Sequence, residues 1–169
     1  VLEPRALYGE REDIEPSDAD IVPLGKAELG AEGSDVTLIG LGSTVATARA
    51  AAESADWSAD VIDLLTLQPW DREAVFASVS KTGRLVIVEE NPRAGGWGAD
   101  IAAAVAEELF DDLVAPIVRV TTPDVPVPFA PELEEKFLPR AEEVVAQVNG
   151  LVDDKRSIGP WWEREIVTV

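Results

Sequence analysis

The chain lacks cysteine and histidine altogether. These absences exclude a disulfide framework, a thiol nucleophile, a Cys/His zinc site and every catalytic arrangement within the chain that depends on histidine. Proton transfer would have to rely on carboxylates, lysines or the single tyrosine, Tyr8. The lack of cysteine is compatible with a reducing compartment, and we expect a cytoplasmic protein.

Basic residues are scarce as well, because 14 Lys and Arg stand against 33 Asp and Glu, a net charge of -19. Such a chain should repel nucleic acid and anionic membranes, so we expect neither as a partner. No apolar run approaches the roughly 18 residues needed to span a bilayer, and the first residues lack the basic start and apolar core of a signal peptide. The acidity fits either a solubilising, salt-adapted surface or a docking face for a basic partner.

Methionine is absent even from the first position, so we expect a fragment or a processed product. In what is present, short β-branched runs alternate with helical segments. Asp71 and Gly83 should bound one helix, and Gly150 should end the last one. Strands are predicted at residues 26–29, 35–40, 60–64, 84–89 and 117–121, and helices at 44–55, 72–80, 99–109 and 140–149. This pattern predicts an α/β domain with a mainly parallel sheet covered on both faces, whose short first strand pairs antiparallel at or near an edge.

The remaining segments differ in composition. Residues 1–23 are rich in charge and proline and are predicted to form an exposed linker, while five prolines between 123 and 139 favour a chain that is extended at first. Residues 151–169 form a C-terminal arm in which Trp161 and Trp162 should seek burial, on this domain or on a neighbouring subunit.

Two glycine-rich turns invite a nucleotide interpretation. Gly40 and Gly42 have dinucleotide-binding spacing and Asp63 ends the next strand, but Val45 replaces the third glycine, so a tight strand-to-helix turn is favoured. The loop 95–98 precedes a helix and lacks the Lys and Ser or Thr of a P-loop. We interpret it as a loop where side chains would not fit.

Acidic residues gather in two further places. Glu89, Glu90 and Asp100 surround the end of a central strand, where they could exchange a proton or hold a cation, although solvated charges and one helix cap are the simpler expectation. Glu107, Glu108, Asp111 and Asp112 lie where a helix ends, a position unfavourable for acids. That run is either a solvated helix end or a surface retained for docking a partner.

Three segments in fixed order carry a family resemblance: Glu32–Val45, Asp60–Asp71 and Ser78–Val105. Together they resemble the C-terminal domain of the beta subunit of a thiamine-diphosphate-dependent 2-oxo acid dehydrogenase, such as the pyruvate and branched-chain enzymes. The resemblance implies a three-layer α/β/α domain of the transketolase C-terminal type, with a five-stranded, mostly parallel sheet and one antiparallel strand. It also implies a division into 1–23, a linker from a missing pyrimidine-binding domain; 24–150, the domain itself; and 151–169, the arm.

The same resemblance implies a role in assembly rather than in the chemical step. In this family the cofactor thiamine diphosphate and its Mg ion lie between an alpha chain and the beta chain's N-terminal domain. We therefore assign no catalytic, cofactor-binding or metal residue here, and we expect the fragment alone to be inactive. The implied partners are an alpha subunit, a second beta subunit and the basic subunit-binding domain of a dihydrolipoyl acyltransferase, docked on Glu107, Glu108, Asp111 and Asp112. A dinucleotide-binding domain and a single-chain transketolase-like enzyme are the alternatives.

Overall fold

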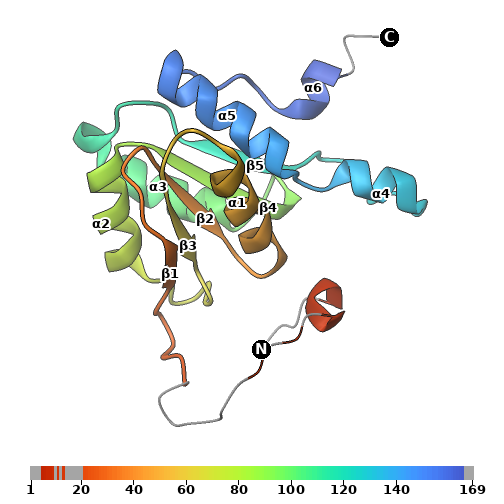
Figure 1. Cartoon of the computed structure of the whole chain (residues 1–169), viewed down its shortest axis with the longest axis horizontal. Helices are drawn as coiled ribbons and strands as arrows, with labels where there is room; N and C mark the ends of the chain where they lie inside the picture. The colour runs from red at the N-terminus through yellow and green to blue at the C-terminus, as the bar shows by residue number, and fades with distance from the viewer. Residues whose placement is uncertain (1–4, 10, 12, 14–20, 166–169) are drawn as a thin grey trace.

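The computed structural model describes residues 5–9, 11, 13 and 21–165, which form a five-stranded sheet between two layers of helices (Figure 1). The sheet order is β1-β3-β2-β4-β5, and only β1 runs antiparallel, paired with β3. The strands are β1 Glu28–Ala31, β2 Val36–Gly40, β3 Ala59–Asp63, β4 Leu85–Pro92 and β5 Val118–Thr122. The predicted fold class is confirmed, including the antiparallel edge strand.

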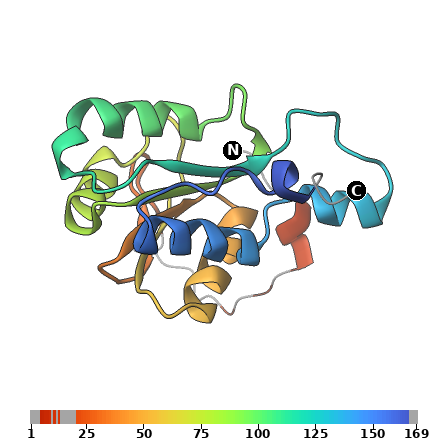
Figure 2. The same ribbon diagram turned by 90° about the horizontal axis from the view of Figure 1, so that it is seen from above.

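Helices cover both faces of the sheet (Figure 2). One face packs on α1 and α5 through a core that includes Val36, Val61 and Val88; the other packs on α2 and α3 through a core that includes Ile39 and Ile87. The helices are α1 Ser43–Ser54, α2 Arg72–Thr82, α3 Gly98–Glu108, α4 Pro131–Phe137, α5 Ala141–Asp153 and α6 Trp161–Glu165, with 3-10 turns η1 Arg5–Gly9 and η3 Phe110–Asp112. None of the helices in the described part of the chain is long and apolar enough to cross a membrane.

The ends of α2 follow the sequence prediction. The Asp71 carboxylate caps the helix by accepting a hydrogen bond from the Ala74 backbone N–H at 3.1 Å, and it also accepts one from Ala27 N–H at 3.1 Å. Gly83 ends the helix with φ 66°, a conformation that favours glycine. Asp71 therefore ties the entrance of the edge strand to the start of α2.

The prediction that Gly150 ends the last helix is wrong, because α5 continues to Asp153. A Cβ on Gly150 would come within 2.8 Å of the Arg156 carbonyl oxygen and of the Ile158 side chain. Glycine is needed here for the close approach of the returning chain, which outweighs its low helix propensity. The proposed boundary at residue 150 therefore falls inside a helix.

Four short helical segments were not predicted: η1, η3, α4 and α6. Pro131 occupies the first turn of α4, where its missing N–H is not needed, so proline starts this helix after an irregular stretch at 123–130. The predicted linker lies mostly outside the described residues, as do the last four residues of the arm.

The described part of the arm packs on this domain. Gln147, which is 2% exposed, donates to the Gly159 carbonyl oxygen at 2.5 Å, and Arg164 pairs with the buried Glu143. Trp161 and Trp162 stack edge to face at 5.7 Å, with the Arg140 guanidinium 5.5 Å from the Trp161 ring. Both tryptophans are half-buried on this domain.

Candidate functional site

The β2–α1 turn, the candidate nucleotide site, is packed with protein atoms. A Cβ on Gly40 would lie 2.8 Å from the Val45 nitrogen, and Gly42 has φ 59°. The Ser43 hydroxyl at the start of α1 donates to the Glu90 carboxylate. A carboxylate thus lies where a pyrophosphate would bind the helix N-terminus, which agrees with a tight structural turn.

Asp63, the candidate ribose ligand, is also engaged within the fold. Its Oδ1 accepts a hydrogen bond from the Leu65 N–H at 3.1 Å, and Glu28 of β1 is its partner in the strand register. Burial, assisted by the nearby Glu28 charge, raises the pKa of Asp63. Asp63 thus lies beside an acidic residue of the edge strand and already accepts a hydrogen bond from its own loop, which does not favour a ribose site.

The glycine loop at 95–98 wraps around a buried carboxylate. Glu89 has no exposed surface and accepts hydrogen bonds from the Gly98 N–H at 2.9 Å and from Asn91 Nδ2 at 3.1 Å. A Cβ on Gly96 would overlap this carboxylate, and one on Gly98 would lie 2.6 Å from it. The loop is therefore a close-approach loop, as the sequence predicted, and its contact is Glu89.

Arg119 on β5 balances the charge of Glu89. Its Nε donates to Glu89 Oε1 at 2.6 Å, and its side chain is only 11% exposed. The expectation that Glu89 is solvated is wrong, because alternate residues of β4 point inward and a matching Arg on the next strand neutralises it. Glu90 and Asp100 are exposed, so the three carboxylates do not converge. Among the described residues no group of three or more acids could hold a metal ion.

A cavity of about 410 Å³ lies between β5 and the returning arm. Its lining mixes two arginines, Arg93 and Arg119, with two acids, Asp124 and Glu163, beside Trp162. Because the Arg119 charge is already used by Glu89, the lining has no net preference for an anion. The cavity supplies no paired acid and base for catalysis.

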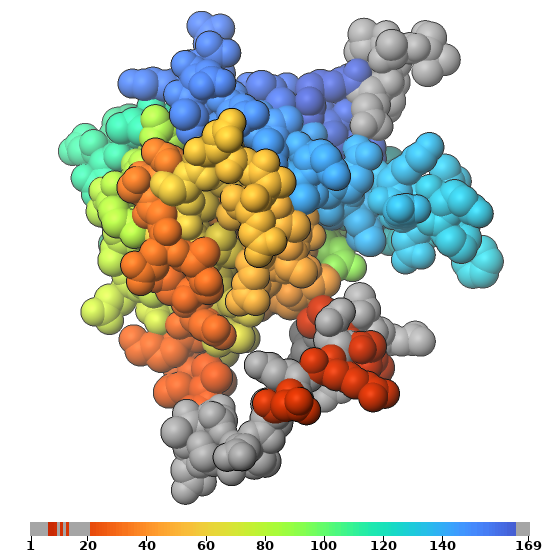
Figure 3. Space-filling model, in the orientation of Figure 1, coloured from red at the N-terminus to blue at the C-terminus, as the bar shows by residue number. Residues whose placement is uncertain are grey.

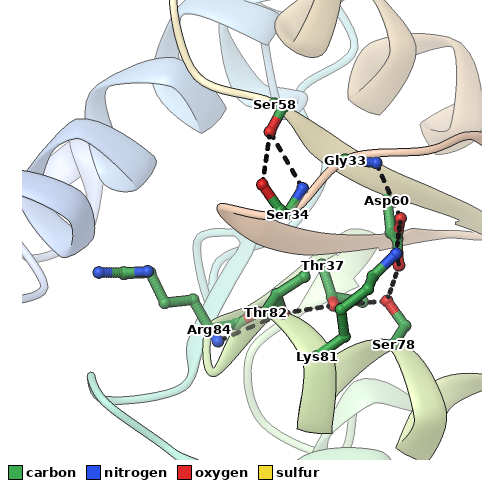
Figure 4. Close-up of polar contacts among 9 residues, drawn as sticks. All are labelled: Gly33, Ser34, Thr37, Ser58, Asp60, Ser78, Lys81, Thr82 and Arg84. Atoms are coloured by element: carbon green, nitrogen blue, oxygen red, sulfur yellow. Dashed lines mark hydrogen bonds and ion pairs between the residues drawn. The ribbon is translucent and has the colours of Figure 1, made fainter.

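The opposite end of the sheet holds a second polar network (Figure 4). Ser78 and Lys81 of α2 donate to the Asp60 carboxylate at 2.6 and 2.7 Å, and the Gly33 N–H donates to it at 2.9 Å. Thr37 extends the network to Ser78 and Thr82. Asp60 is 1% exposed and fully bonded. This is the amino end of the strands, away from the edge where α/β folds bind ligands. The network therefore joins the β1–β2 turn, β2, β3 and α2.

Asp60 should make the stability of the fold depend on pH in the acidic range. Burial opposes its charge, but hydrogen bonds from Lys81, Ser78 and Gly33 outweigh burial and hold the pKa of Asp60 below its usual 3.8. A lowered folded-state pKa stabilises the fold above pH 3.8, and this contribution is lost as pH falls through the lower value. We expect Asp60→Asn to be about 1–3 kcal/mol less stable than wild type at pH 7. The deficit should shrink below pH 3.8 in urea denaturation.

The exposed Asp56→Asn is the matched control for that experiment, and its stability should stay within about 0.5 kcal/mol of wild type at both pH values. If Asp60→Asn lowers the stability equally at pH 7 and pH 3, the conclusion that the ionised Asp60 carboxylate stabilises the fold is wrong.

The acidic run at the end of α3 is on the surface. Glu107 and Asp111 are exposed, Glu108 pairs with Arg72, and Asp112 accepts a hydrogen bond from Ser80 Oγ at 2.6 Å. The structure adds Phe110, which is 73% exposed in their midst. We call Glu107, Glu108, Phe110, Asp111 and Asp112 the acidic ridge. An apolar group within exposed acids was visible in the sequence but was not singled out.

Residues 25–144 match the family model described as transketolase, C-terminal domain. The chain belongs to this family. Among relatives of this transketolase C-terminal domain is the acetoin:2,6-dichlorophenolindophenol oxidoreductase subunit beta of Bacillus subtilis, which is 44% identical over 149 residues. That match covers 86% of this chain and 43% of the relative.

Two further relatives of the domain carry other names. The 2-oxoisovalerate dehydrogenase subunit beta 2, mitochondrial, of Arabidopsis thaliana is 40% identical, with 90% of this chain and 43% of the relative covered. The pyruvate dehydrogenase E1 component subunit beta of Rhizobium meliloti is also 40% identical, with 89% and 33% covered. The chain thus spans less than half the length of these relatives.

A solved structure also resembles the transketolase C-terminal domain described here. It is a split-gene transketolase in an inactive beta4 tetramer, 35% identical with a TM-score of 0.68. The match covers 85% of this chain and 47% of that chain.

Proposed function

We propose that the chain is the assembly and docking domain of the beta subunit of a thiamine-diphosphate-dependent 2-oxo acid dehydrogenase. The observation that carries the proposal is the 40% to 44% identity to three subunits named beta, over 86% to 90% of this chain. In the proposed holoenzyme, which would contain alpha and beta chains in a heterotetramer, a 2-oxo acid is oxidatively decarboxylated and lipoyl-lysine is acylated. The domain contributes to subunit contacts and to docking of the acyltransferase.

The residues described here do not fit thiamine diphosphate or its Mg ion. The glycine loop at the start of α3 is the natural place for a diphosphate, but the Gly98 N–H is bonded to Glu89. The buried carboxylate would repel a diphosphate there. We therefore derive no catalytic step through the cofactor in this domain, and the inactivity of the isolated fragment stays a prediction.

The proposal leaves the substrate at the level of a class. The relatives are named for acetoin, 2-oxoisovalerate and pyruvate, yet all are similar to this one domain. Substrate choice would accordingly lie in other parts of the enzyme, and we keep a pyruvate or branched-chain 2-oxo acid as the proposed substrate. The cytoplasmic location also stays a prediction, since one of these relatives is named mitochondrial.

The acidic ridge supports the docking part of the proposal. Its acids lie around the end of α3, where they oppose the helix dipole, and Phe110 adds an exposed apolar anchor. Exposed charges of one sign accelerate encounter with a basic partner, and an aromatic anchor supplies affinity. The proposed partner is the basic subunit-binding domain of the acyltransferase.

Calorimetric titration of the chain with this basic domain tests the proposal. Reversing Glu107 and Asp111 to lysine changes the ridge without breaking the Glu108–Arg72 or Asp112–Ser80 contacts. We expect the double variant to bind at least about tenfold more weakly at low salt, with a smaller difference at high salt because ions screen exposed charges.

The matched control is Glu53→Lys with Asp56→Lys, which changes the net charge equally at exposed positions near the end of α1. Equal weakening by both double variants would mean that net charge, and not the ridge, governs binding. No binding of the wild-type chain at low salt would count against the docking role.

A further inference from the structure

The connection between β5 and α5 leaves the body of the domain and forms a protrusion. Its ends are fixed, because Thr122 is fully buried and Phe137 is 6% exposed. Between them α4 stands off from the sheet and its covering helices in both ribbon views, and its atoms project from one side of the space-filling view (Figures 1–3). Within the described residues, α4 takes part in none of the extensive contacts between elements. We call residues 124–136 the knob.

The knob exposes apolar side chains that touch little of their own chain. Phe129 is 102% exposed, Val127 65%, Leu133 56% and Val125 55%. Burying one such side chain contributes about 1.5–3 kcal/mol. A partner that covers the knob would therefore gain a large favourable free energy. Exposed apolar side chains concentrated in one short segment are typical of an interaction site.

The knob is nevertheless fixed in shape. Pro126, Pro128 and Pro131 restrict its backbone, and Pro131 starts α4, where the Glu134 N–H donates to the Ala130 carbonyl oxygen at 3.0 Å. At the base of the knob, Asp124 accepts a hydrogen bond from the Ala94 N–H at 3.0 Å. A preformed apolar element loses little conformational entropy on docking, so its burial yields affinity.

Charge around the knob specifies the partner's chemistry. Asp124, Glu132, Glu134 and Glu135 are exposed there, against the single base Lys136. The complementary site is an apolar pocket with a rim of lysine and arginine. A second copy of this chain, with its net charge of -19, would bring like charges together at the knob.

We infer that the knob inserts Phe129 into a basic-rimmed apolar pocket on the companion alpha subunit. The assignment rests on the proposed function, since the relatives are named as beta subunits and so imply a companion of another type. A permanent subunit contact suits the knob because such interfaces have apolar centres, whereas the acidic ridge is mostly charged. The two surfaces thus serve two different partners.

Binding of the chain to the purified alpha subunit of the same enzyme tests the inference. Phe129→Ser should weaken binding about 30-fold, which corresponds to roughly 2 kcal/mol. Its melting temperature should not change, because the side chain is fully exposed in the chain alone. Leu24→Ser, at an 81% exposed apolar residue outside the knob, should bind as wild type does. Glu132→Lys with Glu135→Lys should weaken binding at low salt more than at high salt.

The outcomes separate the inference from the proposed function. If wild type binds the alpha subunit and Phe129→Ser binds equally well, the inference is overturned while the proposed function stands. If wild type does not bind the alpha subunit, both are overturned. The inference is also overturned if Phe129→Ser abolishes self-association of the chain, or abolishes binding of the acyltransferase domain. Either result would mean that the knob binds a different partner.

Discussion

Replacing Glu89 by alanine should lower the free energy of unfolding by about 3–5 kcal/mol. The change removes the acceptor for the Gly98 N–H and for Arg119 Nε, and it leaves the Arg119 charge, 11% exposed, without its counterion. An unpaired buried charge is more costly than the loss of a neutral hydrogen bond. Urea denaturation at pH 7 measures the effect as a shift in the midpoint.

Glu90→Ala is the control, since the neighbouring carboxylate is exposed and its removal should change stability by less than about 1 kcal/mol. Substituting both Glu89 and Arg119 by methionine should recover much of the loss, because no buried charge is then left unpaired. A Glu89→Ala variant as stable as Glu90→Ala would show that the ion pair does not hold the glycine loop.

The Glu89–Arg119 ion pair could not be predicted from the sequence. Both residues lay in predicted strands, Glu89 at the end of one and Arg119 in the middle of another. An arginine in a buried strand requires a buried counterion, and alternation along the strand sends Glu89 to the face of Ile87. The register that pairs Ile87 with Arg119 follows from the sheet order, which the residues alone do not give.

The order of strands and helices was predictable because each local signal agreed with the others. Buried β-branched runs, the Asp71 cap and the Gly83 turn all survive in the structure. The errors arose where a tertiary contact overrode a local preference: Gly150 lies inside α5 because the chain returns across it. Prolines likewise predicted extended chain, but Pro131 starts α4.

The candidate surfaces were only partly predictable for a related reason. The acidic ridge was visible as a run of four acids, but the contacts that occupy Glu108 and Asp112 come from α2, distant in the sequence. The proline-rich segment of the knob was visible as either a structural segment or a subunit contact. The exposure of its side chains was not predictable, because Val, Phe and Leu between prolines are typical of core as well as of surface. Exposure is a property of the whole fold, so the sequence cannot distinguish a docking side chain from a buried one.

Replacing Gly33 by alanine should destabilise the chain by at least about 3 kcal/mol. A Cβ at this position would overlap the backbone at Ser58 and Ala59, and backbone cannot move aside as a side chain can. The shift would also break the 2.9 Å hydrogen bond from the Gly33 N–H to Asp60, at the centre of the network that joins the β1–β2 turn, β2, β3 and α2. Thermal and urea denaturation should both report the loss.

Gly30→Ala is the matched control three residues away, since its Cβ would meet only the mobile end of Arg49 and stability should stay within about 1 kcal/mol. Equal stability of the two variants would mean that the turn between β1 and β2 can move away from β3, and that Asp60 does not need this donor.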